Sequence, residues 1–220
     1  MIRLRKVKKL RRARVGRKER GNGGGNFGII TLLEPSRLRK GRSAMKISSK
    51  LEEAVNKQIN AEFYSAYLYL GMSSRCAETN LKGIAHWFYV QSQEEMTHAI
   101  KFYRFLLDRG GHPAMPAVEG VRTDWKDPLE MFQAAYAHEQ KVTAMINGIA
   151  DIALAERDHA TASMLNWFVD EQVEEEANAS EIAEKLRLIG SSKDGLFMLD
   201  KELSVRVFVD RTQPAGGAQA

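Results

Sequence analysis

The polar and apolar positions of residues 49–189 repeat with a helical period. Apolar side chains recur at alternating steps of three and four residues, which places them on one face of an α-helix. The pattern is clear in one series of core positions: Phe132, Ala135, Glu139, Val142, Ile146 and Ile149. Because four long segments share this pattern, we expect four amphipathic helices packed around a common core.

Capping and turn residues set the limits of these segments. They predict helices over about 49–78, 81–109, 128–156 and 158–189, and a shorter helix over 193–203. The first helix is expected to open with a Ser49-x-x-Glu52 capping box. The third is expected to start at Asp127-Pro128, an N-cap followed by a proline at the first helical position. The fourth is expected to end at Gly190.

The lengths of the connections predict how the helices are arranged. Short turns join the first helix to the second and the third to the fourth, so each pair should be antiparallel. The link over residues 111–126 is long: sixteen extended residues reach roughly 53 Å, whereas a helix of about 28 residues is roughly 42 Å long. The second and third helices can therefore be parallel. We expect an all-α four-helix bundle with one long crossover and a short fifth helix.

Every predicted core face carries a carboxylate near its middle. These residues are Glu62, Glu95, Glu139 and Glu175, and His98 follows Glu95 by one turn. A buried carboxylate is costly unless it is paired, protonated or bound to a metal, and the four faces contain no Lys or Arg. Carboxylates combined with an imidazole suit iron or manganese. The set matches the ligands of a di-iron carboxylate bundle.

The two halves of the bundle repeat imperfectly. Glu62 and Glu95 are 33 residues apart, and so are Glu139 and Gln172. Glu95-x-x-His98 therefore corresponds to Gln172-x-x-Glu175, and the second half lacks the histidine. We expect two unequal metal positions that share Glu95. The richer one uses Glu62, Glu95 and His98, and the weaker one uses Glu95, Glu139 and Glu175, with Gln172 close by.

Several of these residues also have purely structural interpretations. A single Glu on a core face is usually an edge residue, and His98 or Tyr69 alone would ordinarily belong to the core. Four carboxylates at matching depth favour the metal site over that interpretation. A second acidic group flanks the site at Glu94, Glu171, Glu174 and Glu176. Spacing alone is equally compatible with a solvated charged face and with a further iron position.

Charge divides the chain into segments. Residues 1–44 hold 15 Lys/Arg against 2 Asp/Glu, a net charge of +13, and the remainder has a net charge of −8. An acidic body favours cations over nucleic acid. We expect a disordered basic arm over 1–44, a folded bundle over 45–206 and a flexible tail over 207–220. Met45 precedes the first helix directly and is the expected native start; a native arm would instead indicate nucleic-acid binding.

Other features of composition limit the possible locations. Cys76 is the single cysteine, so no intrachain disulfide can form, which fits a reducing compartment. The sequence contains no apolar run of membrane-spanning length and no secretory signal. We therefore expect a cytoplasmic protein with no membrane partner.

Several motifs together resemble those of prokaryotic non-haem ferritins, a ferritin-like di-iron family. The resemblance covers about residues 46–206. It rests on Asn60-Ala61-Glu62-Phe63-Tyr64, Gln93-Glu94-Glu95-Met96-Thr97-His98, His138-Glu139-Gln140, Asp170-Glu171-Gln172-Val173-Glu174-Glu175-Glu176 and Leu199-Asp200-Lys201-Glu202-Leu203.

This resemblance implies a fold and an activity. Glu62, Glu95, His98, Glu139 and Glu175 match the family's ferroxidase ligands, with Gln172 adjacent and Tyr69 nearby. Glu94, Glu171 and Glu174 match its third-iron ligands. The resemblance also implies iron oxidation by O2 or peroxide, storage of the Fe(III) product, and a 24-subunit homo-oligomeric shell. We expect no haem, because haem-binding relatives carry Glu-x-x-His in both halves.

Three other functions compete with ferroxidase and storage. A di-iron oxygenase or peroxidase would use a more symmetric, retained metal pair and a substrate pocket. A DNA-binding protein would use the basic arm over 1–44. A metal-free structural bundle is the third alternative, and the costly buried carboxylates of the core argue against it.

Overall fold

A computed structural model describes residues 46–212 of the chain. The predicted basic arm over 1–44, the predicted start at Met45 and residues 213–220 of the predicted tail over 207–220 lie outside the described residues, whereas residues 207–212 of that tail lie within them. Within the described range the secondary structure consists of α-helices, without strands. Their bounds are α1 Ser49–Glu78, α2 Lys82–Asp108, α3 Pro128–Ala155, α4 His159–Ile189 and α5 Lys193–Leu203.

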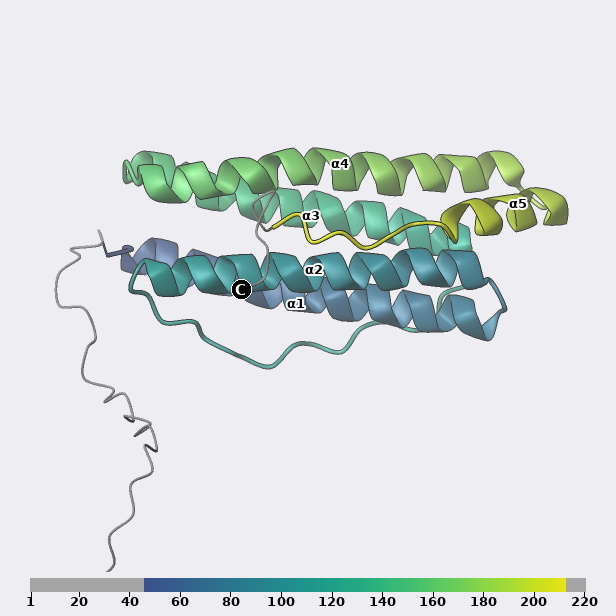
Figure 1. Ribbon diagram of the computed structural model, residues 1–220, viewed down its shortest axis with the longest axis horizontal. Coiled ribbons are helices and arrows are strands. Elements are labelled where there is room, and N and C mark those ends of the chain that lie inside the picture. The colour runs from purple at the N-terminus through teal and green to yellow at the C-terminus, as the bar shows by residue number, and fades with distance from the viewer. Residues whose placement is uncertain (1–45, 213–220) are drawn as a thin grey trace, which may run out of the picture. The chain divides into compact units, whose positions relative to one another are not determined.

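The four long helices form a bundle from two antiparallel hairpins, α1–α2 and α3–α4 (Figure 1). The connection between α2 and α3 runs the length of the bundle, so that α2 and α3 are parallel (Figure 1). It lies along α1, where Asn56 Nδ2 donates to His112 O at 3.1 Å and Asn56 Oδ1 accepts from Ala114 N at 2.6 Å. The predicted all-α fold, a ferritin-like four-helix bundle with one long crossover and a short fifth helix, is confirmed.

Helix ends follow the predicted capping residues with one exception. Asp127 accepts from Glu130 N at the start of α3, and Gly190 ends α4 with a φ of 57°. The predicted Ser49-x-x-Glu52 capping box is wrong, because the N-cap of α1 is Ser48, whose hydroxyl accepts from Leu51 N at 3.1 Å. Glu52 Oε1 instead accepts from His112 N at 2.9 Å and helps to hold the crossover.

A polar layer divides the core into two apolar clusters. On one side Phe88 and Phe132 stack with ring centroids 4.6 Å apart. On the other side Phe102 and Phe168 stack at 4.0 Å. These rings keep water from both sides of the layer between them, so polar groups in that layer must find partners within the protein.

Helix α5 closes one end of the bundle. Leu199 is buried in the core, and Asp200 Oδ1 accepts from Ile84 N at 2.9 Å, which caps the start of α2. Gly83 permits this approach, since a Cβ there would lie 1.6 Å from Asp200 O. Phe197 remains exposed. Helix α5 thus presents apolar residues both to the intrachain core and to the surface.

After α5 the chain turns back along the bundle, between α2 and α4 in the view of Figure 1, and its side chains contact both helices. We call residues 204–212 the C-terminal strap. Among the described residues, no helix is both long and apolar enough to cross a membrane.

Candidate metal centre

The polar layer contains a compact group of possible metal ligands. Glu62 of α1 and Glu95 and His98 of α2 are all buried, and one ligand atom from each lies within 4.8 Å of the others. His98 Nδ1 lies 3.3 Å from Glu95 Oε2. The structure therefore brings together the three residues that the sequence assigned to the richer metal position.

A second group shares His98 but differs from the expected one. His98, Glu171 and Glu175 also offer ligand atoms within 4.8 Å of one another. The sequence had combined Glu95, Glu139 and Glu175 instead. Glu175 is buried as predicted, Glu171 is half-buried, and Glu139 does not belong to this second group.

Glu139 is buried in the same layer, but other side chains occupy its oxygens. The Tyr69 hydroxyl donates to Glu139 Oε1, and Gln172 Nε2 donates to Glu139 Oε2 at 3.2 Å. The Tyr69 ring stacks on Phe88 with centroids 6.1 Å apart, which fixes the phenol within the core. Tyr69 and Gln172 thus lie where the sequence placed them, as direct neighbours of a predicted ligand.

Two buried glutamines hold the other carboxylates, and sequence reasoning did not assign them this part. Gln58 Nε2 donates to Glu62 Oε1 at 2.8 Å. Gln91 Nε2 donates to Glu175 Oε2 at 2.6 Å and to Glu95 Oε1 at 3.3 Å. Their spacing in the sequence could have indicated this role. Each glutamine precedes a core glutamate by four residues, and the two glutamines are 33 residues apart, as Glu62 and Glu95 are.

The layer is rich in acceptors that lack donors. Within the described part of the chain, three buried oxygens have no hydrogen-bond partner: Glu62 Oε2, Gln58 Oε1 and Gln91 Oε1. Unpaired buried acceptors are costly, whereas a cation stabilises several at once. Carboxylate and imidazole donors suit a first-row metal such as iron. The residues present therefore fit a bound iron ion.

Burial and mutual repulsion raise the pKa values of the core carboxylates. Burial, followed by the charge of Glu95, raises the pKa of Glu62 to about 8. Burial, followed by the charge of Glu139, raises the pKa of Glu175 to about 8 and that of Glu95 well above its usual range. Burial raises the pKa of Glu139 to about 7 although Tyr69 opposes the shift. Without a cation these groups retain protons near neutral pH.

The three residues matched to a third iron lie together on the outside of α2 and α4, but arginines of the C-terminal strap pair with them. Arg206 forms an ion pair with Glu94. Arg211 lies 2.6 Å from Glu174 Oε2 and 3.6 Å from Glu171 Oε1. Neither arginine was predicted to lie near the site, since both follow the predicted helices, where no helical spacing indicates their position.

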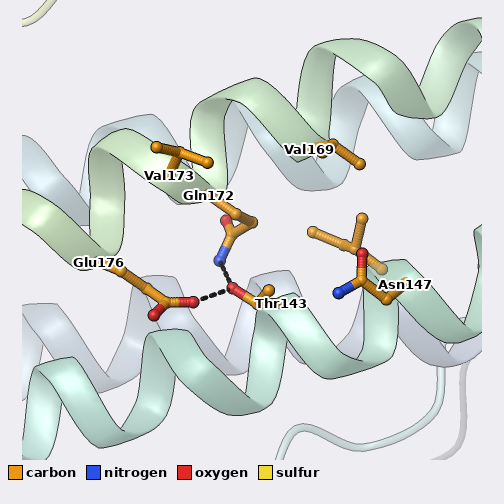
Figure 2. A pocket seen from close by; sticks show the side chains of 7 residues that line it. Thr143, Asn147, Val169, Gln172, Val173 and Glu176 are labelled. Carbon is orange, nitrogen blue, oxygen red and sulfur yellow. Dashed lines mark hydrogen bonds between the residues drawn. The ribbon is translucent and has the colours of Figure 1, made fainter.

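A cleft of about 340 Å³ between α3 and α4 leads to the same layer. Figure 2 shows Gln172 and Glu176 of α4 converging on the hydroxyl of Thr143 in α3. Gln172 Nε2 donates to Thr143 Oγ1 at 3.2 Å, and Thr143 donates to Glu176 Oε1 at 2.6 Å (Figure 2). Gln172 thus connects the buried Glu139 with this half-buried surface carboxylate.

The chain is therefore a helical-bundle protein with a buried carboxylate–histidine centre. Comparison with known sequences shows to which family of such proteins it belongs. A profile of the ferritin-like domain matches residues 52–189. The bacterial non-heme ferritin of Bacteroides fragilis strain 638R is 42% identical over 160 residues, 73% of this chain and 99% of that protein. That of Staphylococcus aureus strain MRSA252 is 38% identical over 162 residues, 74% of this chain and 98% of that protein.

Solved structures agree with this placement. An open pore ferritin from the archaeon Archaeoglobus fulgidus is 51% identical, with a TM-score of 0.73, over 74% of this chain and 100% of that chain. A humanized archaeal ferritin is 49% identical, with a TM-score of 0.74, over 74% and 99% of the two chains. The chain belongs to the ferritin family of iron-storage proteins, and the resemblance to prokaryotic non-haem ferritins is confirmed.

Proposed function

We propose that this ferritin is a ferroxidase whose substrate is Fe(II) and whose product is stored as hydrated Fe(III) oxide. The observation that supports this most strongly is the buried group of Glu62, Glu95 and His98, in which Glu62 Oε2 has no partner among the described residues. An iron ion at this position satisfies that oxygen and compensates the charge of both carboxylates.

The two Fe(II) substrates bind unequally in this proposal. Glu62, Glu95 and His98 hold one ion, and Glu95 is shared with the other. Glu175 and Glu139 hold the second ion, beside Gln172. Glu139 must first exchange its hydrogen bond from Tyr69 for the metal, which makes this position the weaker one. A weakly held second ion suits a product that has to leave.

The chemistry balances with dioxygen as the oxidant. Each Fe(II) gives up one electron, and two Fe(II) with two protons reduce O2 to hydrogen peroxide. Peroxide can replace dioxygen and accept the same two electrons, which yields water. The protein contributes a template that holds both ions together, and carboxylates whose negative charge favours Fe(III) over Fe(II).

Storage requires an assembly and a path for the product. By analogy with the family we propose a homo-oligomeric shell, of 24 subunits, that encloses the oxide. Glu94, Glu171 and Glu174 are the proposed third-iron residues, adjacent to the centre on the outside of α2 and α4. We propose no haem site, because Gln172-x-x-Glu175 lacks the second histidine.

Iron loading of the full chain tests this proposal. Fe(II) is added anaerobically, air is admitted, and Fe(III) formation and retention are followed. The Glu95→Ala, His98→Ala double variant should oxidise iron more than about 100-fold more slowly, since even outer-shell changes cost 10–100-fold. The matched control is Glu53→Ala, His159→Ala, which removes the same two residue types from exposed helix positions.

Each outcome has a definite meaning. Rapid oxidation by the wild-type and control proteins, with many irons per chain co-migrating with a large assembly, supports ferroxidase and storage together. Oxidation with only about two irons retained per chain, the content of a fixed di-iron pair, favours an oxygenase or peroxidase. Equal rates for the double variant and the control contradict the proposed site.

A further inference from the structure

The C-terminal strap covers the outer carboxylates of the bundle. It runs between α2 and α4 in the view of Figure 1 and places an arginine at each end of the acidic group. Alternate residues face away from the bundle, and Val205, Val207 and Val209 are exposed. The residues that alternate with these valines, Arg206, Phe208 and Asp210, are half-buried.

Arg206 is a firmly held contact. Its guanidinium pairs with Glu94 and lies 4.4 Å from the centre of the Trp87 ring. Its carbonyl oxygen accepts from His86 Nε2 at 2.8 Å. The side chains of Arg206 and Glu94 are only 19% and 13% exposed, so separating them would leave two partly desolvated charges.

Arg211 is a loosely held contact. Its side chain is 53% exposed, and that of Glu174, its nearer partner, is 59% exposed. Exposed pairs of this kind change an equilibrium constant by only about 5-fold or less. Glu171 is the second partner, at 3.6 Å, and its side chain is largely buried at 12% exposed.

Glu171 points towards the metal centre as well as towards the strap. It belongs to the group that it forms with His98 and Glu175, whose ligand atoms lie within 4.8 Å of one another. Arg211 thus lies against a carboxylate that also reaches a possible metal position. A cation at Glu171 and Glu174 would compete with this guanidinium directly.

We propose that Arg211 is an exchangeable counter-ion: a divalent cation that binds Glu171 and Glu174 displaces it and frees the end of the strap. Arg206 stays in place as the hinge, and Glu94 remains paired with it. The exchange thus makes two of the three proposed third-iron residues, Glu171 and Glu174, available to the cation. The exchange regulates how readily iron occupies the outer position, and it rests on the proposed function of the inner site.

Electrostatics favours the exchange of the Arg211 guanidinium for a divalent cation. A divalent cation carries twice the charge of a guanidinium and can bind two carboxylates at bonding distance. The pair that it disrupts is exposed and weak. With the cation absent, Arg211 neutralises the outer carboxylates and limits their repulsion with the buried ones.

Zinc binding with a label on the strap tests the proposal in the full chain. Zn(II) is used as a redox-inert probe. Val209→Cys introduces an exposed thiol for a nitroxide, and the single native cysteine, Cys76, is buried. We expect restricted nitroxide motion without metal and faster motion once Zn(II) exceeds the two inner equivalents. Arg211→Gln should show fast motion throughout and bind the outer Zn(II) about 2–5-fold more tightly.

Two further variants complete the experiment. Glu174→Gln should abolish outer binding and free the label without metal, whereas the control Arg187→Gln, an exposed arginine paired with Glu184, should behave as wild type. A label whose motion is unchanged at saturating Zn(II), or outer affinity unaffected by Arg211→Gln, overturns the exchange. Absence of the two tight inner equivalents contradicts the proposed function itself, so the two failures are distinguishable.

Discussion

At the scale of single residues, amide groups determine how the buried carboxylates are held. Gln58 and Gln91 each donate one hydrogen bond or more to a core glutamate, and each retains an unpaired oxygen among the described residues. Donated hydrogen bonds favour the ionised form that a metal requires. The glutamines therefore favour the ionised carboxylates that the proposed iron site needs, without neutralising their charge.

Replacement of Gln91 tests this role. Gln91→Leu removes the donor to Glu175 and Glu95, so both carboxylates should retain their protons more strongly. We expect about 10–100-fold weaker binding of Zn(II) or Fe(II) near neutral pH, measured by calorimetric titration. Gln133→Leu, at an exposed position of α3, is the matched control. Equal affinities for the two variants would show that Gln91 only fills space.

The pKa values of the core predict how stability without metal depends on pH. Folded Glu139, Glu62 and Glu175 have pKa values of about 7, 8 and 8, against 4.5 for an ordinary glutamate. Above pH 4.5 the unfolded chain has released protons that the folded chain retains, so stability falls as the pH rises through the folded pKa values of about 7 and 8. Buried His138, with a pKa of about 4 against 6.5, acts oppositely, but only below pH 6.5.

The range from pH 6.5 to 8 therefore isolates the carboxylates. Thermal unfolding in the presence of chelator should show a falling Tm across this range, and saturating Zn(II) should remove most of the slope. A loss of about 2 kcal/mol corresponds to roughly 4–8 °C for a chain of this length. A Tm that is constant or rises with pH would contradict the raised pKa values.

At the scale of residues, the sequence predicted which site residues are buried better than it predicted their hydrogen-bond partners. The carboxylates, His98, Gln172 and Tyr69 are buried where helical spacing placed them. Spacing could not show that Glu139 bonds to Tyr69 and Gln172, or that Glu171 approaches His98, because rotamers decide these contacts. The assignment of individual residues as ligands stays a prediction.

At the scale of elements, periodicity and capping residues were sufficient to predict all five described helices and the crossover. The error at Ser49 arose because Ser48 and Ser49 are both acceptable N-caps, and the contact between Glu52 and His112 lies 60 residues away in sequence. The strap was missed because a segment without helical period gives no sequence signal of where it docks. Only the folded bundle shows which carboxylates Arg206 and Arg211 meet.

The packing of α5 on α2 gives a prediction at this scale. Gly83→Ala should destabilise the protein, although alanine is the better helix former, because the added Cβ would lie 1.6 Å from Asp200 O. Gly148→Ala in α3 is the matched control, where no heavy atom lies within 4 Å of the added Cβ, and should stabilise by about 0.5–1 kcal/mol. Thermal unfolding measures both. Stabilisation by both variants would contradict the close packing of α5.

At the scale of the whole molecule, the chain combines an acidic body with a strongly basic N-terminal segment. Almost the full length of the bacterial relatives, 98–99%, aligns with about three quarters of this chain. The residues of the proposed site and strap all lie within the described part. We therefore propose that iron chemistry belongs to residues 45–212 and is independent of residues 1–44.

Removal of residues 1–44 separates the two possible activities of the chain. The deletion changes the net charge from +5 to −8, so it should abolish any binding of duplex DNA. If the full chain binds DNA through this segment, the logarithm of its affinity should fall linearly with the logarithm of salt concentration. Iron oxidation per chain and the size of the assembly should be unchanged by the deletion. Slower oxidation or a smaller assembly would show that the basic segment takes part in the storage function, and the division of the chain proposed from its charge pattern would be wrong.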